Sequence, residues 1–269
     1  IRDRIETISK RSDASFFYKN KVKKILMKNN KINGIELNNN KVIDCDTIIF
    51  NGDPKALFDG LLGDEIQNAV SSNNINKRSL SAYVWSFAAK TQGLDLLHHN
   101  VLFNKNYRTE FDDIKRGEIP KDTTLYICAQ GSINNPRPKE KSLGRFEIII
   151  NGSPTYNHKK YNKQKEYTKC KEITFSILDS MGLKMDLKPT EEMLTTPKEF
   201  EQLFPGSQGS LYGRTPHGIS STFMRPRNKS KIKGLLLAGG GTHPGAGIPM
   251  ACLSGKHAAE MILKDLSLT

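Results

Sequence analysis

Residues 234–262 read GLLLAGGGTHPGAGIPMACLSGKHAAEMI, and this stretch decides the fold. An apolar run from Leu235 to Ala238 leads into a loop with glycines at positions 239, 240, 241, 245 and 247, and a helical pattern follows from Ile248. Strand, glycine loop and helix in this order are typical of an anion or nucleotide site. Glycine lets the backbone approach a phosphate, and the start of the helix offers free N–H groups.

The loop matches neither of the two well-known phosphate-binding motifs. A P-loop would need glycine at Met250 and a hydroxyl residue at His257. A dinucleotide fingerprint counted from Gly239 has Pro244 in its third glycine position, and one counted from Gly245 has Met250 there. We therefore expect a second glycine loop that closes over a cofactor held elsewhere. The alternative is a tight turn whose glycines serve only close packing.

Composition limits the class of protein. The 269 residues are 36% hydrophobic, the mean hydropathy is −0.53, and no apolar run approaches the ~20 residues that span a bilayer. The net charge is +13, but Lys far outnumbers Arg. Because Arg is the residue that binds phosphates and bases bidentately, nucleic-acid binding is not expected. Compositional drift toward Lys, Asn and Ile and attraction to an anionic membrane surface both explain the charge.

Cysteine and histidine give no expected metal site. The four cysteines form no CxxC pair and have no histidine at zinc-finger spacing, which indicates a reduced, cytoplasmic compartment; they are Cys45, Cys128, Cys170 and Cys252. His98 and His99 are adjacent. If they lie on a strand, their side chains point to opposite faces, and we expect them to bind no metal.

The first part of the chain has the pattern of a β-meander. Short apolar segments at 22–28, 32–37 and 42–43 are separated by Asn-rich turns. Residues 47–50, TIIF, form a continuous apolar run, which predicts a strand buried on both faces. Asn51 and Asp53–Pro54 follow this run in a loop.

The middle of the chain is expected to be mainly β, with two helices. Segments 80–89, 124–129 and 146–150 have strand patterns, and apolar residues recur at helical spacing over 163–181. Thr196–Glu199 has the form of a capping box with proline at the first helical position. The fold class is therefore α/β, mixed with α+β. A partial Rossmann-like domain, residues 1–60 and 228–269, would carry an inserted, mainly β domain, residues 61–227.

The glycine stretch resembles the C-terminal flavin motif of the carotenoid desaturases of the phytoene desaturase type, which are FAD-dependent and related to amine oxidases. Residues 21–54, KVKKILMKNNKINGIELNNNKVIDCDTIIFNGDP, resemble the same family. Residues 98–114, HHNVLFNKNYRTEFDDI, 119–130, IPKDTTLYICAQ, and 195–226 are similar to one branch, the hydroxycarotenoid 3,4-desaturases or methoxyneurosporene dehydrogenases. The family's opening GxGxxG is missing, and so is an initiator Met. We therefore expect the C-terminal portion of a longer enzyme, inactive by itself.

The resemblance implies a set of cofactor-binding residues. Residues 239–242 would lie beside the ribityl–pyrophosphate arm of FAD, residues 245–247 under its ring system, and residues 248–250 would open the last helix toward the pyrimidine end of that ring. The implied set is Val22, Asn51, Gly239, Gly240, Gly241, Thr242, His243, Gly245, Gly247, Ile248, Pro249 and Met250. Val22 would face the adenine, with an ordinary core valine as the alternative. By the rule for open α/β sheets, Asn51 at a strand's carboxyl end is also expected near the ligand.

Catalytic and substrate residues are less well defined. His243 is a weak candidate for a general base, and a cofactor-orienting or structural role is the alternative. A carotenoid tunnel could be lined by Trp85, Phe87, Tyr212 and Phe223, with core packing as the alternative. We expect Arg214 and Arg225 to form ion pairs and Asp53 to form a plain turn.

The implied function is FAD-dependent desaturation of an acyclic carotenoid, hydroxylated or methoxylated, at the 3,4 bond. Because such a substrate resides in the bilayer, peripheral contact with the inner membrane from the cytoplasmic side is expected, with no nucleic acid as a partner. Two enzyme alternatives stay open: a phytoene desaturase and another amine-oxidase-like FAD oxidoreductase. A non-enzymatic alternative is an inactive fragment that binds a lipid surface.

Overall fold

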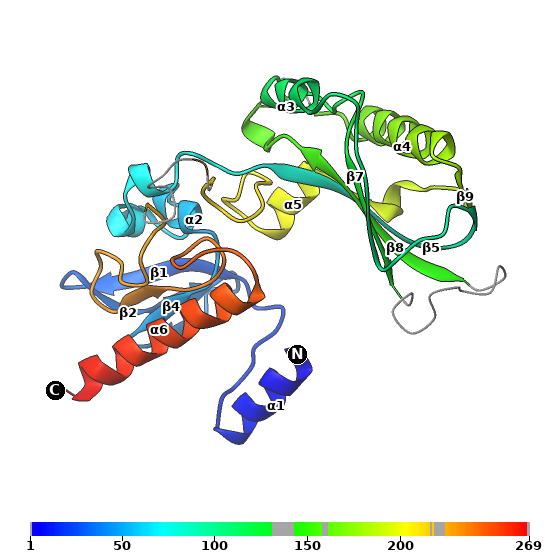
Figure 1. Ribbon diagram of the computed structural model, residues 1–269. Helices are drawn as coiled ribbons and strands as arrows, with labels where there is room; N and C mark the ends of the chain where they lie inside the picture. The colour runs from blue at the N-terminus through cyan, green and yellow to red at the C-terminus, as the bar shows by residue number, and fades with distance from the viewer. Residues whose placement is uncertain (1, 131–142, 158–160, 216, 218–223, 268–269) are drawn as a thin grey trace.

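A computed structural model describes residues 2–130, 143–157, 161–215, 217 and 224–267 (Figure 1). The described chain forms two units. The first contains the meander, the short β4 strand and the last helix, and the second is a larger antiparallel sheet with helices on one side (Figure 1). The helix α1, Arg2–Arg11, has no buried residue. Among the described residues, no helix combines the length and apolarity that crossing a membrane requires.

The meander is confirmed. Its three antiparallel strands are β1 (Val22–Lys28), β2 (Lys31–Leu37) and β3 (Val42–Asp44). The turn between the first two consists of Asn29 and Asn30, with φ of 52° and 59°. Asn tolerates this left-handed conformation better than most residues, so the Asn-rich turn sets the hairpin.

A two-stranded parallel sheet joins distant parts of the chain. Strand β4 (Ile48–Phe50) pairs with β11 (Leu235–Leu237), and helix α6 (Ile248–Ser267) packs on β11 through Ala258, which is fully buried. The prediction that β4 is buried on both faces is wrong, because Ile49 is 42% exposed. Ile48 and Phe50 pack against the core of the first unit, whereas Ile49 points to the opposite, open face of the sheet.

The core of the first unit extends beyond the sequence-based boundary at residue 60. Helix α2 (Pro54–Phe58) is followed by two 3-10 segments, η1 (Asp64–Ala69) and η2 (Ser72–Asn74). Ile66 and Ile75 are buried in the same hydrophobic cluster as Leu235. The first segment of this unit therefore reaches at least Ile75.

The second unit is a six-stranded sheet with helices against one face. The strand order is β10-β5-β8-β7-β6, with β9 also pairing with β5. The strands are β5 (Ser81–Gly93), β6 (His99–Leu102), β7 (Leu125–Gln130), β8 (Gly144–Gly152), β9 (Leu183–Asp186) and β10 (Leu194–Thr195). The helical segments are α3 (Tyr107–Lys115), η3 (Thr155–Asn157), α4 (Lys163–Ser180), η4 (Glu191–Met193) and α5 (Pro197–Leu203). Side chains of α4, including Cys170 and Leu178, complete the core against the sheet.

Two helical features predicted from local sequence patterns are confirmed in this unit. Helix α4 occupies nearly the predicted range and is followed by Gly182 at φ +77°. At the start of α5, the Thr196 side chain accepts from the backbone N–H of Glu199, and the Glu199 carboxylate accepts from that of Thr196. This reciprocal pair is the predicted capping box.

Candidate cofactor site

The parallel strands bring the two predicted loops together. The N–H of Ala238 donates to the carbonyl of Phe50 at 3.0 Å, so the carboxyl ends of β4 and β11 lie at the same edge. Asn51 and Gly239 are the residues that follow. A Cβ on Gly239 would lie 2.5 Å from Asn51 Oδ1, and Gly239 has φ +107°. Only glycine allows this close approach.

The first half of the glycine loop is closely packed within the chain itself. A Cβ on Gly241 would lie 2.9 Å from Cδ of Pro54, and one on Gly213 would lie 3.0 Å from the Cα of Gly241. At Gly241, the glycine serves close packing within the turn, which is the alternative to a cofactor-binding role given in the sequence analysis. Any cofactor contact here would involve backbone groups.

The second half of the loop is open. Gly247 has φ +97°, and a Cβ added there would meet nothing within 4 Å. Ile248 is 66% exposed and Met250 is 40% exposed at the start of α6, beside the exposed Pro249. The space next to Gly247 is therefore open, and a ligand could approach the backbone there.

Thr242 and His243 lie between these halves. Thr242 is fully buried, and its Oγ1 has no hydrogen-bond partner among the described residues. The N–H of His243 donates to the carbonyl of Pro226 at 2.8 Å, and the His243 side chain is half-buried. The backbone of the loop is thus fixed, while the buried Thr242 hydroxyl has no partner within the described chain.

Arg225 holds the glycine loop in place through hydrogen bonds to backbone carbonyls. Its Nη1 donates to the carbonyls of Tyr212 at 2.7 Å and Gly240 at 2.9 Å, and its Nη2 donates to the carbonyl of Arg214 at 3.0 Å. Arg214 Nη1 in turn donates to the carbonyl of Asn73. The expectation of ion pairs is wrong for both arginines, since their partners in the described chain are carbonyls. A planar fork with five donors can bridge several carbonyls at once.

A buried ion pair adjoins Arg225. Arg78 pairs with Asp53, the residue before Pro54, and both side chains are nearly inaccessible. The pKa of the Arg225 guanidinium is lowered, first by burial and then by the positive charges of Arg214 and Arg78, against the opposing effect of Asp53. Three buried arginines therefore face one carboxylate here. The region behind the loop carries excess positive charge.

Asn228 and Ser254 anchor the last helix to the sheet. Asn228 Nδ2 donates to the carbonyls of Leu237 at 2.9 Å and Ser254 at 2.8 Å. The hydroxyl of Ser254 accepts from the N–H of Gly239 at 2.7 Å. These bonds fix the N-terminal half of α6 relative to the end of β11.

The aromatic substrate candidates separate into different environments. Trp85 is fully buried, packs against Phe175 of α4, and donates from Nε1 to Thr174 at 3.1 Å. Phe87 lies on the same side of β5, against the same core. Both belong to the core, because alternate residues of β5 face the helix layer. Tyr212 is exposed beside the loop, and Phe223 lies outside the described residues.

Val22 and the His98–His99 pair lie away from the glycine loop in sequence. Val22 begins β1 and is half-buried, and its contact with adenine stays a prediction. The argument that His98 and His99 must point apart is wrong. Their ring centroids lie 4.3 Å apart because β6 begins only at His99, so strand alternation does not apply to His98.

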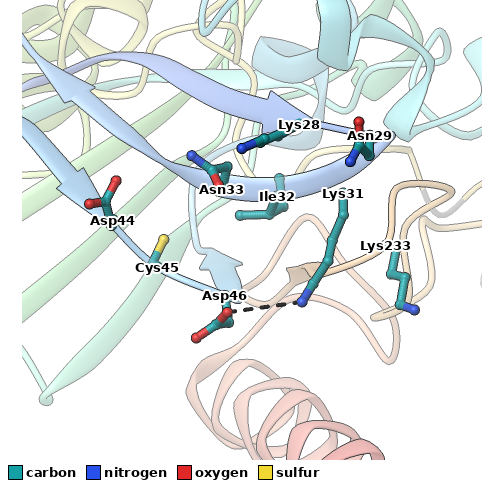
Figure 2. A pocket seen from close by; sticks show the side chains of 9 residues that line it. All are labelled: Lys28, Asn29, Lys31, Ile32, Asn33, Asp44, Cys45, Asp46 and Lys233. Carbon is teal, nitrogen blue, oxygen red and sulfur yellow. Dashed lines mark ion pairs between the residues drawn. The ribbon is translucent and has the colours of Figure 1, made fainter.

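A cavity of about 460 Å³ lies at the opposite edge of the β4–β11 sheet (Figure 2). It is lined near the amino ends of these strands by Asp46 and Lys233, and Lys31 reaches toward Asp46 at 3.9 Å. The lining is polar and open, and ligands of open α/β sheets gather at the carboxyl edge instead. We therefore assign the cofactor site to the glycine loop.

Sequence reasoning missed Arg78, Asn228 and Ser254. The sequence did contain one indication of a role for Arg78, because Arg is scarce in a chain whose basic residues are mostly Lys. Where Arg persists in such a chain, its fork geometry is needed, as in a bidentate or buried contact. Asn228 and Ser254 carried no comparable signal, because single Asn and Ser residues are common in loops and helices.

Comparison with known proteins shows which families the chain is similar to. A family model described as flavin containing amine oxidoreductase matches residues 178–263. The hydroxyneurosporene desaturase of Cereibacter sphaeroides is 47% identical over 246 residues, which are 91% of this chain and 48% of that protein. The hydroxyneurosporene desaturase of Rhodobacter capsulatus is 45% identical over 251 residues, 93% of this chain and 49% of that protein. The chain thus spans about half the length of these curated relatives.

The fold agrees with this relationship. An oxidoreductase from Methanosarcina mazei has a similar solved structure, with a TM-score of 0.55 at 15% identity, covering 96% of this chain and 53% of that one. At this identity the likeness concerns the fold alone, and the family resemblance rests on the sequence matches. By sequence, this chain is therefore similar to the carotenoid desaturases related to phytoene desaturase and, over residues 178–263, to the flavin-containing amine oxidoreductases.

Proposed function

We propose that this chain forms part of an FAD-dependent desaturase that acts on an acyclic carotenoid, hydroxylated or methoxylated, at the 3,4 bond. The observation that carries the proposal is the open glycine loop at the carboxyl edge of the β4–β11 pair, in a chain 47% and 45% identical to two hydroxyneurosporene desaturases. The similarity of residues 98–114 and 195–226 to the 3,4-desaturase branch supports the choice of bond.

The residues at the loop fit a flavin. Thr242 offers a buried hydroxyl without a partner, and Gly247 leaves open space where any side chain would stand. The start of α6 directs its N-terminal dipole at that space. When bound, the flavin supplies the hydride acceptor for dehydrogenation of a C–C bond.

The chain's own charges favour the reduced cofactor. The N-terminus of α6 stabilises a nearby negative charge by roughly 0.3–1 kcal/mol. The arginines behind the loop add positive potential, because Arg225 lies near Arg214 and Arg78 and their charges are opposed by Asp53. Both effects would stabilise negative charge on a flavin bound beside this loop and so would raise its reduction potential. His243, half-buried and fixed through its backbone, orients the loop in this proposal.

We also propose peripheral contact with the cytoplasmic face of the inner membrane. An apolar carotenoid is stored in the bilayer, so the enzyme must reach it at the membrane surface. The excess of Lys supports attraction to anionic lipid, at roughly 1 kcal/mol for each basic residue near the surface.

The decisive experiment uses the whole protein that contains this chain. The purified protein is denatured, and the released flavin is identified as FAD or FMN by chromatography. Enzyme that contains the identified flavin is then given hydroxyneurosporene or phytoene, and the product's absorption spectrum is recorded. We expect FAD, and a longer polyene from hydroxyneurosporene only. Conversion of phytoene instead would identify a phytoene desaturase, and absence of any flavin would overturn the proposal.

A further inference from the structure

Three metal-ligating side chains meet at one edge of the second unit, away from the glycine loop. One ring nitrogen of His98, one of His99 and the Sγ of Cys128 all lie within 4.8 Å of one another. The His98 Nε2 and Cys128 Sγ are 3.8 Å apart. Cys128 is buried, while His99 is exposed, so the group lies at the surface and is accessible from one side.

The sheet explains why these residues converge. His99 on the edge strand β6 is the direct cross-strand partner of Cys128 on β7. Directly opposed residues of antiparallel strands project from the same face. Tyr126 is two residues from Cys128 and shares that face, and its Oη lies 2.7 Å from His99 Nδ1. This contact orients the His99 ring, as partners of metal-bound histidines do.

The His98 imidazole makes no strong hydrogen bond within the described part of the chain. Its Nδ1 is buried and has no hydrogen-bond partner among the described residues. Its Nε2 has only the weak thiol contact with Cys128 at 3.8 Å. Buried polar groups are normally paired, and the His98 ring has no strong partner here, so its Nε2 beside Cys128 is available to bind a cation.

We propose that His98, His99 and Cys128 bind one Zn²⁺ ion. Imidazole and thiolate ligands together favour zinc, which binds nitrogen at about 2.0–2.1 Å and sulfur at about 2.3 Å. In tetrahedral geometry these bonds place nitrogen and sulfur about 3.5 Å apart. The observed 3.8 Å needs only a small adjustment. Binding requires that Cys128 release its proton.

The proposed ion joins two strands of the second unit. Its three ligands come from the start of β6 and from β7, so it would hold the edge strand in register, with water in the fourth position. This role is separate from the desaturase site, because it involves none of the glycine-loop residues. The two proposals can therefore fail independently.

The test is a metal titration of the purified, chelator-treated protein. Zn²⁺ alone is titrated in equilibrium dialysis with metal analysis, and Co²⁺ alone is titrated while thiolate-to-cobalt charge-transfer absorption is followed. We expect one ion per chain and a charge-transfer band at one equivalent. We expect His99→Gln to weaken binding at least about tenfold, and Cys128→Ala to abolish the band. His257→Gln and Cys252→Ser, which change a histidine and an exposed thiol elsewhere, should bind like the wild type.

Absence of saturable Zn²⁺ binding by the wild type would overturn the proposal without any variant. Unchanged binding by both His99→Gln and Cys128→Ala would overturn it as well. His99 is exposed, so His99→Gln should fold normally even if Cys128→Ala does not.

Discussion

The guanidinium of Arg78 forms a two-pronged, buried ion pair with the carboxylate of Asp53. Nη1 and Oδ1 are 3.2 Å apart, and the side chains are 2% and 9% exposed. Asp53 also accepts from the N–H of Lys55 at 2.9 Å and so caps α2. Arg78 donates to the carbonyl of Ser207 at 3.1 Å, in the segment that returns from the second unit. The Arg78–Asp53 pair therefore connects the loop after β4 with both chain segments that link the two units.

Asp53→Asn should strongly destabilise the protein. The amide keeps the shape and the helix cap but leaves the Arg78 charge buried without a counter-ion, which typically costs about 3–5 kcal/mol. Urea unfolding measures the loss. The control is Glu260→Gln, which removes an exposed pair with Lys256 and should cost less than about 1 kcal/mol. Equal, small losses in both variants would show that the Arg78–Asp53 pair contributes little.

Gly247→Ala should reduce flavin binding, and Gly182→Ala should not. Both glycines have positive φ, +97° and +77°, and in both cases an added Cβ meets nothing within 4 Å. The backbone strain is thus matched, at roughly 1–2 kcal/mol each. Only the Cβ at 247 would occupy the space that we propose for the flavin. We expect at least roughly tenfold weaker flavin binding, equivalent to 1.4 kcal/mol, for Gly247→Ala.

Flavin titration of the whole apoprotein, followed by fluorescence, measures this difference, and urea unfolding without flavin checks that the strain is equal. If both variants bind flavin alike, the open side of the loop does not face the cofactor.

Arg225→Lys should loosen the glycine loop. The single Nζ of a lysine cannot occupy both Nη positions of Arg225, so at least one of the bonds to Tyr212, Gly240 and Arg214 is lost, and each buried acceptor left unpaired costs about 1–3 kcal/mol. We expect a loss of at least roughly 2 kcal/mol in unfolding free energy, together with weaker flavin binding. Arg227→Lys, an exposed neighbour, is the matched control and should leave both quantities unchanged. Wild-type behaviour of Arg225→Lys would contradict its assigned role.

Stability should fall above pH 9, partly because of Cys170. Burial raises the pKa of its thiol from 9.0 to about 12. Between these values the unfolded chain loses this proton and the folded chain keeps it. Stability therefore decreases with rising pH, by about 1.4 kcal/mol per pH unit for a full proton. Below pH 9 both states keep the proton and the effect vanishes.

The comparison is between wild type and Cys170→Ala in urea unfolding from about pH 8 to pH 10.5. The variant should show a shallower decline over this range. Burial also raises the pKa of Tyr83, and this contribution cancels because both proteins contain it. Cys252→Ala, which removes an exposed thiol, should keep the wild-type slope. Identical slopes for wild type and Cys170→Ala would contradict the raised pKa.

Features set by neighbouring residues were predictable from the sequence. The Asn29–Asn30 turn and the capping box from Thr196 to Glu199 each depend on a few adjacent positions, and both are confirmed. Asn51 was expected near the ligand because it follows the carboxyl end of a strand, but the pairing of β4 with β11 that brings it against Gly239 was not predicted.

Features that depend on distant residues were not predictable. Asp53 was taken as a plain turn because its partner, Arg78, is 25 positions away. The strand residue Ile49 was expected to be buried because an apolar run carries no information on whether both faces of its sheet are covered. His98 was misjudged for a related reason: where a strand begins decides whether alternation applies, and that boundary is set by pairing with β7.

The anchoring of α6 has a consequence for sequence change. The hydroxyl of Ser254 holds the N–H of Gly239, while Asn228 holds the carbonyl of Ser254 itself. The chain between Gly239 and Ser254 is therefore tied at both ends and has a set length. An insertion or deletion there would shift the helix by a register step even if every glycine were kept. Related chains should thus preserve this spacing more strictly than the identity of the residues within it.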